Sequence, residues 1–300
     1  MSPSSHTPRW SLSDLPAQTG RTVLITGAGS GIGLETARAF ASAGARVTLA
    51  VRTLDAARAA ASDLPGDPEV LPLDLADLSS VRGFAAAWDR PLDVLVNNAG
   101  VANVPLGRTA DGFERHLGTN HLGHFALTNL LLPRITDRVV TVASNAHKGA
   151  TLDLTDLNWQ RRPYRASAAY GQSKLANLLF TLELRRRLTE AGSPVLAVAA
   201  HPGAATTGLN RHLGPALAFV AATVGRIIQQ SGSAGALPIL FAATRPLVGG
   251  SYVGPDGRGE QRGHPTLVGR SAAAQDPVLA RELWDASERL TSTAFPLLVP

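Results

Sequence analysis

The chain has 300 residues, of which 44% are hydrophobic and 17% charged, which excludes a wholly disordered chain or a coiled coil. It contains no cysteine, and this excludes disulfides, zinc fingers, iron–sulfur clusters and a thiol nucleophile. The net charge is +5, but the basic residues are scattered and the densest run is Arg185–Arg187, so we expect no nucleic-acid partner. The length fits one large α/β domain or two small ones.

No segment has the pattern of a signal peptide or of a membrane span. Residues 1–20 lack the apolar core of a signal peptide. Leu213–Gly225 is apolar but too short to cross a bilayer, and the longer stretch Ile227–Thr244 is interrupted by two glutamines and a proline. We therefore expect a cytoplasmic protein without a membrane span.

Short apolar runs alternate with helical segments through the first two thirds of the chain. The predicted strands are Thr22–Thr26, Arg46–Ala50, Glu69–Leu73, Asp93–Val96, Arg138–Ala143 and Val195–Ala200. Most are nearly continuous in Val, Leu and Ala, as strands buried on both faces must be. The predicted helices are Ile32–Ala43, Leu54–Ser62, Ser79–Trp88, Asp111–Leu132 and Ala168–Ala191. This alternation predicts an α/β fold of the Rossmann type, a doubly wound parallel sheet with helices on both faces.

The pattern changes after about residue 203, where Gly and Pro become frequent. We predict a mostly helical apolar stretch at Leu213–Gln230, a short strand within Gly249–Gly259 and a final amphipathic helix at Pro277–Leu290. The predicted organisation is therefore an N-terminal extension (1–20) followed by a single domain (21–300). Within this domain, 204–245 would shape a substrate pocket or lid, and 249–300 would form the C-terminal segment.

A glycine-rich loop, TGAGSGIG, follows the first predicted strand and opens the first predicted helix. Glycines here allow a tight turn, a close approach to a pyrophosphate and close helix–strand packing, and the pyrophosphate would lie on the helix N-terminus. A glycine cluster is a weak signal alone, but its place between strand and helix predicts dinucleotide binding over a structural turn. The contacting residues would be Gly27, Ser30, Gly31, Ile32 and Gly33.

Polar residues also end the next strands, at the edge where a doubly wound sheet binds its ligand. Asp74 and Leu75 end the third strand, and the fourth is followed by Asn98, Ala99 and Gly100. Either motif alone is more often a cap or turn. Together they predict the adenosine end of the cofactor site.

The end of the second strand bears on the choice of cofactor. Arg52 and Thr53 stand there, and no acidic residue occurs before Asp55. An acidic residue would accept a hydrogen bond from the ribose 2′-hydroxyl of NAD(H), whereas an arginine suits the 2′-phosphate of NADP(H). The sequence therefore predicts NADP(H), with NAD(H) and a merely solvated arginine as the alternatives.

Tyr170 and Lys174 are four residues apart on a predicted helix and so share one face. A phenol with an ordinary pKa near 10 is a poor acid–base catalyst at neutral pH, but a nearby ammonium group and a cationic nicotinamide would favour the phenolate. Ser144 follows the fifth strand and would point into the same crevice. Asn120 lies inside a predicted helix, where its propensity is poor.

These motifs resemble those of the short-chain dehydrogenase/reductases over nearly the whole chain. The resemblance rests on TGAGSGIG, NNAG, Asn120, Ser144, YGQSK and the turn His201–Gly203 followed by Thr207. Within the family the chain is most similar to the retinol-dehydrogenase-like branch and its bacterial relatives. The residues that carry this closer likeness are 10–20, Arg52, Asn120–His124 and Tyr252–Pro255.

The resemblance implies a catalytic tetrad and an alcohol or carbonyl as the small-molecule substrate. Tyr170 would be the general acid or base, and Ser144 would bind the substrate oxygen. Lys174 would bind the nicotinamide ribose and tune Tyr170, while Asn120 would hold a water of a proton relay. Pro202, Gly203 and Thr207 would contact the nicotinamide, and no metal is expected. Members are often homodimers or homotetramers, and the sequence does not choose between these states.

Several alternatives stay open at this point. The chain could be a cofactor-binding regulator without turnover, although the complete tetrad speaks against this, or less plausibly an epimerase or dehydratase of the extended branch. His147 and His201 resemble catalytic bases, but we interpret them as structural because Tyr170 fills that role. The apolar 204–245 region predicts a bulky, poorly soluble substrate.

Overall fold

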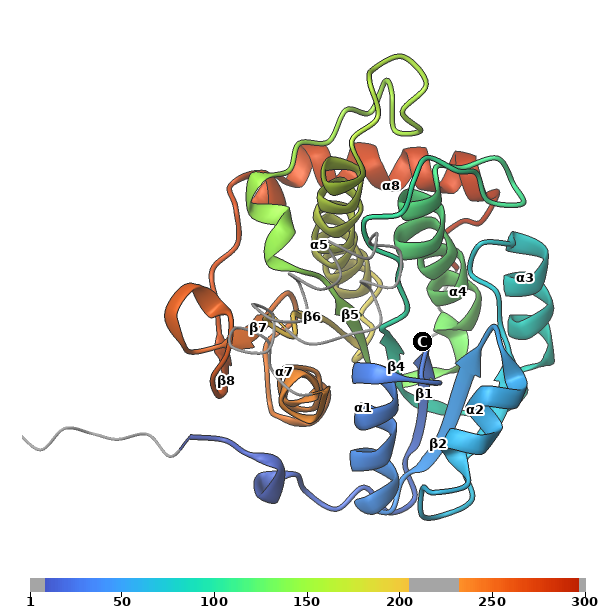
Figure 1. Ribbon diagram of the computed structural model, residues 1–300, viewed down its shortest axis with the longest axis vertical. Coiled ribbons are helices and arrows are strands. Elements are labelled where there is room, and N and C mark those ends of the chain that lie inside the picture. Colours follow the sequence, from blue (N-terminus) through green and yellow to red (C-terminus); the bar gives the residue numbers. More distant parts are fainter. Residues whose placement is uncertain (1–8, 205–231, 297–300) are drawn as a thin grey trace, which may run out of the picture.

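The computed structural model describes residues 9–204 and 232–296, and a single sheet of eight strands lies at its centre (Figure 1). The strand order is β3-β2-β1-β4-β5-β6-β7-β8, parallel throughout except that β8 runs antiparallel to β7. The strands are β1 Thr22–Thr26, β2 Arg46–Val51, β3 Glu69–Pro72, β4 Leu92–Asn97, β5 Ile135–Val142, β6 Leu196–Ala200, β7 Tyr252–Pro255 and β8 Pro265–Leu267. The predicted doubly wound fold is confirmed.

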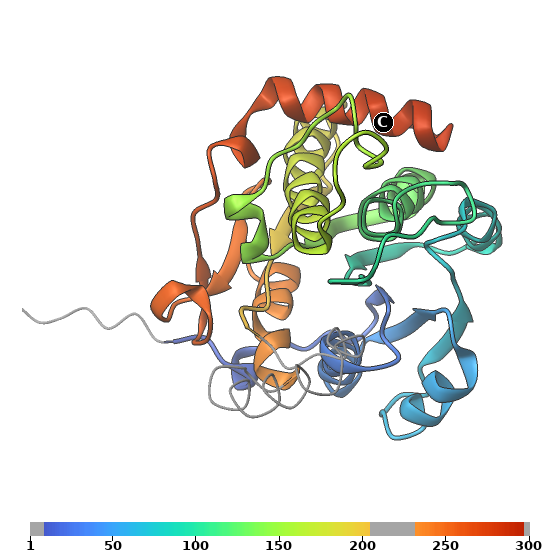
Figure 2. The ribbon, with the colours of Figure 1, turned by 45° about the horizontal axis from the view of Figure 1, so that its top comes forward.

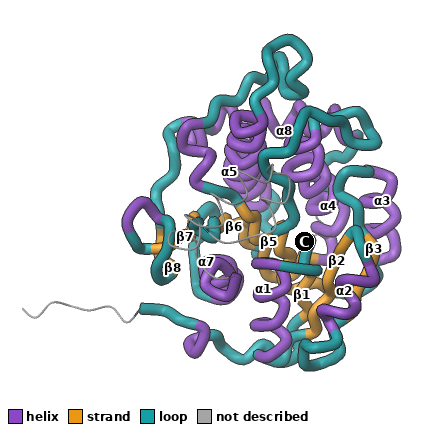
Figure 3. Tube along the Cα trace, viewed as in Figure 1, coloured by secondary structure: helices purple, strands orange, loops and turns teal. Residues whose placement is uncertain are grey.

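Helices cover both faces of this sheet (Figure 3). One face packs against α1 Gly31–Ser42, α2 Leu54–Ala61 and α7 Gly232–Thr244. The other face packs against α3 Leu78–Ala87, α4 Gly123–Leu131 and α5 Ala166–Glu190. The last helix, α8 Pro277–Thr291, lies across the outer side of α5 (Figure 2).

The central strands are apolar without interruption because each of their faces meets a helical layer. In β1, Val23 and Ile25 pack on the side of α1 and α7, whereas Leu24 packs on the opposite side. β4 lies in register with it, Val94 beside Val23 and Leu95 beside Leu24, so each layer receives a continuous row of side chains. After β1 the chain continues toward one edge of the sheet, and after β4 it continues toward the other edge. A ligand crevice opens between two strands whose connections diverge in this way, here β1 and β4.

The predicted helix Asp111–Leu132 is wrong at its N-terminal end. Residues 111–114 form a turn and a short bridge, Arg108 with Glu114, before a π-helical turn at Leu117–Leu122 leads into α4. The carboxylate of Glu114 accepts hydrogen bonds from the backbone N–H groups of His116 (3.0 Å) and Leu117 (2.8 Å). These bonds satisfy donors that a helix start leaves unpaired, so the helix begins only after Glu114.

The region after residue 203 differs from its prediction in part. The short strand within Gly249–Gly259 is present as β7, and the final helix is present as α8, but α7 and β8 were not predicted. Pro238 inside α7 breaks the sequence pattern that would indicate a helix. The predicted stretch Leu213–Gln230 lies outside the described residues. Among the described residues, no helix combines the length and apolarity needed to cross a membrane.

Candidate active site

A cavity of about 540 Å³ opens at the carboxyl ends of the strands, where the sheet order reverses. Most of the residues predicted to bind the cofactor line it, namely Gly27, Ser30, Gly31, Ile32, Gly33, Arg52, Thr53, Asp74, Leu75, Asn98, Ala99, Gly100, Tyr170, Lys174 and Pro202. Ser144, Asn120 and Gly203 lie near this cavity without lining it. Thr207 lies outside the described residues.

Three of the four glycines of the first loop, Gly27, Gly31 and Gly33, serve different purposes. A β-carbon on Gly27 would lie 2.9 Å from Cα of Ala99, and one on Gly33 would lie 2.5 Å from Nδ2 of Asn98. Both positions therefore exclude a side chain by packing. Gly31 has φ +58°, and a β-carbon there would meet no atom of residues 9–204 and 232–296 within 4 Å. Gly27 and Gly33 thus let the first loop approach the turn after β4, and Gly31 leaves the backbone accessible to a ligand.

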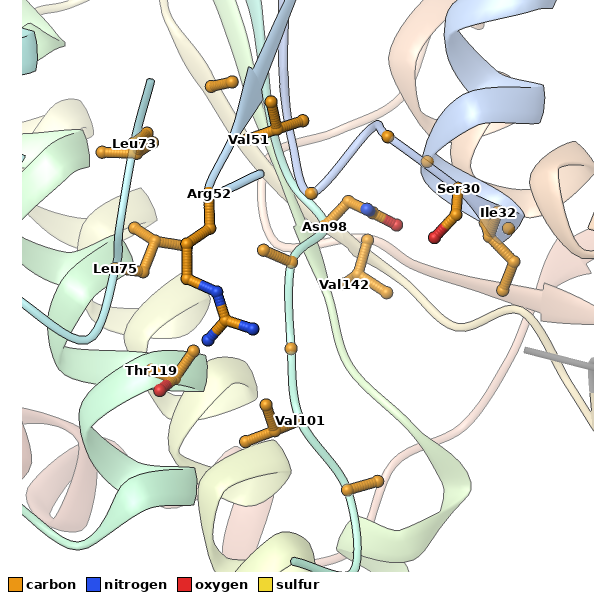
Figure 4. Close-up of a pocket in the computed structure, with 18 of the residues that line it drawn as sticks. Ser30, Ile32, Val51, Arg52, Leu73, Leu75, Asn98, Val101, Thr119 and Val142 are labelled. Atoms are coloured by element: carbon orange, nitrogen blue, oxygen red, sulfur yellow. The ribbon is translucent and has the colours of Figure 1, made fainter. Parts of the chain in front are cut away.

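The two ends of the cavity suit two anionic groups. At one end α1 begins after Ser30, whose side chain makes no capping hydrogen bond, so the first-turn N–H groups of the helix are not capped by it. At the other end the side chain of Arg52 extends from the end of β2 into the pocket toward Thr119 (Figure 4). Asn98 lies between these ends in the same view. This arrangement fits a cofactor with a central pyrophosphate and a further phosphate on its adenosine ribose.

Thr26 is a site residue that the sequence analysis named only as part of the glycine loop. Its hydroxyl oxygen accepts hydrogen bonds from the backbone N–H groups of Asn98 (2.9 Å) and Ala99 (3.0 Å). Its proton goes to Nε2 of His124 (2.8 Å), because Nδ1 of that ring donates to the carbonyl of Asn120 (3.0 Å). Burial lowers the pKa of His124 to about 4, so the ring is neutral at pH 7 and can accept this bond.

Asn120 lies in the π-helical turn before α4, with its side chain fully bonded. Oδ1 accepts from the N–H of Val101 (2.8 Å), and Nδ2 donates to the carbonyl of Val101 (2.9 Å) and to Oγ of Ser173 (2.9 Å). The side chain therefore fixes the segment that follows Gly100. Its implied part in a proton relay stays a prediction.

α5 brings Tyr170 and Lys174 together in the wall of the cavity. Lys174 is 4% exposed, its Nζ donates to the carbonyl of Val142 (3.0 Å), and it lies 5.8 Å from the ring centroid of Tyr170. Burial lowers the pKa of Lys174 to about 8. Burial also raises the pKa of Tyr170, and a hydrogen bond with the side chain of Ser144 opposes this rise. Without a bound cofactor, the expected lowering of the phenol pKa is therefore not found.

Beside Tyr170 a buried polar network supports an apolar wall of the cavity. The Tyr164 hydroxyl lies 3.0 Å from Glu114 Oε1 and 3.2 Å from the carbonyl of Val104, and His116 Nδ1 lies 2.8 Å from the same Glu114 oxygen. Val104 lines the cavity together with Val101 and Ala102. The sequence analysis missed this network because its members are 50 residues apart along the chain.

His147 and His201, the two histidines that resemble catalytic bases, have both ring nitrogens in hydrogen bonds. Nδ1 of His147 donates to the carbonyl of Ser144 (2.6 Å), and its Nε2 accepts from the N–H of Ser271 (3.3 Å). Nδ1 of His201 accepts from the N–H of Gly203 (3.2 Å), and its Nε2 lies 3.0 Å from Oε2 of Glu260. These bonds support the structural interpretation of both rings.

The sequence profile of the family described as short chain dehydrogenase matches residues 21–218. The chain therefore belongs to the short-chain dehydrogenase family and is an NAD(P)-dependent oxidoreductase that acts on CH–OH groups. Its predicted likeness to the retinol-dehydrogenase branch is confirmed.

Two curated relatives and one solved structure show the closeness of the match. The chain is 41% identical to human retinol dehydrogenase 13 (92% of this chain, 86% of the relative) and 42% identical to mouse polyprenol dehydrogenase (92% and 85%). It is also similar to the crystal structure of a putative uncharacterized protein from Mycobacterium paratuberculosis. That match has 52% identity and a TM-score of 0.86, and it covers 97% of this chain and 100% of the other.

Replacing Thr26 by valine keeps the shape of the side chain but removes its hydroxyl. The partly buried N–H of Ala99 and the Nε2 atom of His124 then lose their partner, and the N–H of Asn98 keeps only the carbonyl of Val96 (3.0 Å), so unfolding should require about 1–3 kcal/mol less. Denaturant unfolding measures this change. Thr22→Val in the same strand is the control and should stay within about 0.5 kcal/mol of the unchanged protein. Equal effects of the two substitutions would contradict the role assigned to the Thr26 hydroxyl.

Proposed function

We propose that the protein is an NADP(H)-dependent oxidoreductase that interconverts an alcohol and a carbonyl on a bulky, mostly apolar substrate. The observation that carries this proposal is the layout of one cavity. The same cavity is lined by Arg52, where an acidic residue would serve NAD(H), by the start of α1, and by Tyr170 and Lys174.

The residues present fit the cofactor along its whole length. The first-turn N–H groups of α1 would hold the pyrophosphate, and the guanidinium of Arg52 would hold the 2′-phosphate. The backbone near Asn98 would contact the adenosine, Lys174 the nicotinamide ribose, and the turn Pro202–Gly203 the nicotinamide. When bound, the nicotinamide supplies or accepts a hydride.

Tyr170, Ser144 and Lys174 would carry out the proton transfer. In reduction, the Tyr170 hydroxyl gives its proton to the carbonyl oxygen, and in oxidation the phenolate takes the proton of the alcohol. Ser144, whose side chain lowers the pKa of Tyr170, would donate to the same substrate oxygen. The ammonium group of Lys174 stabilises the phenolate by its charge, and this effect is strengthened because Lys174 is only 4% exposed.

The substrate class follows from the wall of the cavity and from the relatives. Val101, Ala102 and Val104 present an apolar surface close to Tyr170. The relatives named for retinol and polyprenol act on long apolar alcohols, and the same kind of substrate suits this wall.

Arg52→Ala tests the choice of cofactor. Removal of the guanidinium should weaken NADPH binding at least about tenfold, which corresponds to the loss of one charge-assisted phosphate contact. The affinity for NADH should stay nearly unchanged. Fluorescence titration of both nucleotides gives the two dissociation constants. If the ratio of these constants is the same before and after the substitution, Arg52 does not read the 2′-phosphate.

Tyr170→Phe removes the hydroxyl that carries the transferable proton and leaves the ring, so NADPH should still bind while turnover falls by a factor of about 10²–10⁴ or more. Retinal and an aromatic ketone are suitable carbonyl substrates, with NADPH oxidation followed by absorbance. Tyr164→Phe makes the same chemical change outside the reaction centre and should keep turnover within a few-fold. Near-normal turnover in Tyr170→Phe would refute the proposed function.

Lys174→Met tests whether the ammonium charge tunes the phenol. Oxidation needs the phenolate, so its rate rises with pH through the phenol pKa, and loss of the positive charge should move this rise to higher pH. The measurement is the pH profile of alcohol oxidation at saturating NADP for both proteins. Lys174→Arg keeps the charge and should show a smaller shift. An unshifted pH profile together with weaker NADP binding would mean that Lys174 only binds the ribose and does not tune the phenol pKa.

A further inference from the structure

One carboxylate connects the two segments that the proposed function places around the nicotinamide. Glu260, in the loop between β7 and β8, accepts a hydrogen bond from Nζ of Lys148 at Oε1 (2.7 Å). Its other oxygen, Oε2, lies 3.0 Å from Nε2 of His201. Lys148 belongs to the turn that begins after Ser144, whereas His201 begins the turn that contains Gly203. Glu260 thus bridges the end of β5 and the end of β6.

The bond to His201 has a defined direction. Nδ1 of His201 accepts from the N–H of Gly203 (3.2 Å), so the ring proton is on Nε2 and is donated to Glu260. Burial lowers the pKa of His201 to about 4 although Glu260 opposes the shift, so the ring is neutral at pH 7. The His201 side chain is 0% exposed, so Glu260 is the acceptor that satisfies its buried Nε2–H group in the structure.

The backbone of the loop is held in an uncommon conformation at the same place. Gly259 and Glu260 both have positive φ, +64° and +55°. Residues other than glycine rarely adopt a backbone conformation with positive φ, so surrounding contacts must maintain this conformation at Glu260. The side-chain amide of Asn145, which follows Ser144, donates to the carbonyls of Gly259 (3.2 Å) and Glu260 (3.4 Å). Asn145, the neighbour of Ser144, thus helps to hold the backbone of Glu260 in place.

The loop also fits closely against the turn after β6. The N–H of Ala204 donates to the carbonyl of Gln261 (2.8 Å). Gly203 has φ +70°, and a β-carbon there would lie 2.4 Å from the same carbonyl oxygen. The position of the Pro202–Gly203 turn therefore depends on where the loop lies.

We propose that Glu260 is a positioning residue that sets the Pro202–Gly203 turn against the segment of Ser144, and thereby shapes the nicotinamide end of the site. This inference rests on the proposed function, because it assumes that the nicotinamide lies between these segments. Glu260 acts through His201 and Lys148 and touches neither cofactor nor substrate. An ion pair that only stabilises the loop would leave the affinity for the nicotinamide unchanged.

The test compares two nucleotides that differ by the nicotinamide half. Glu260→Ala should weaken NADPH about tenfold, as the loss of a charge-assisted buried hydrogen bond predicts, and should change the affinity for adenosine 2′,5′-bisphosphate less than about twofold. Calorimetry measures both constants. Glu260→Gln retains an acceptor oxygen for His201 and should recover part of the NADPH affinity. It also keeps the test decisive if Glu260→Ala does not fold.

Glu282→Gln is the matched control, because Glu282 is exposed on α8 and no hydrogen bond or ion pair is found for its side chain within 9–204 and 232–296. It should change neither constant. The proposal is overturned if the Glu260 variants weaken both nucleotides equally, or neither, whatever happens to the melting temperature. A failure of the proposed function looks different, since then the unchanged protein would not bind NADPH or Tyr170→Phe would keep its turnover.

Discussion

The cofactor cavity depends on one close approach, between the turn after β1 and the turn after β4. A side chain at Gly27 has no room there, since its β-carbon would lie 2.9 Å from Cα of Ala99. The hydroxyl of Thr26 binds the N–H groups of Asn98 and Ala99 across the same gap. Because the sheet order reverses between these two strands, their spacing decides where the start of α1 stands relative to the opposite wall.

Neutral histidines hold the rest of the site together. His124, His147 and His201 are all buried, and burial lowers the pKa of each ring. A neutral imidazole has one donor and one acceptor, so each ring joins two different segments of the chain without adding charge. His124 connects α4 to β1, His147 connects the Ser144 turn to Ser271, and His201 connects its own turn to Glu260. In the proposed mechanism, the charged groups at the site are therefore Tyr170, as the phenolate, and Lys174, not the histidines.

At the reaction centre, burial acts on the two titrating groups in opposite directions. It raises the pKa of Tyr170 and lowers the pKa of Lys174 to about 8, so each charged form is unfavourable by itself. A phenolate beside an ammonium group is favourable as a pair, because each charge compensates the other where water is excluded. In the mechanism we propose, the buried pair favours charge separation once the cofactor and substrate are in place.

The sequence by itself determined strands β1–β7, the glycine loop and the pairing of Tyr170 with Lys174, because each depends on residues that are close together in the chain. Strands buried on both faces need unbroken apolar runs, and a four-residue spacing puts two side chains on one helix face. The sequence did not reveal that Glu114 delays a helix, that Thr26 accepts two amides, or that Glu260 joins Lys148 to His201. The bonds of Glu114 are local, whereas those of Thr26 and Glu260 span 59 to 112 residues. Only the tertiary structure decided the long-range bonds, since local periodicity contains no information about which distant donor meets which acceptor.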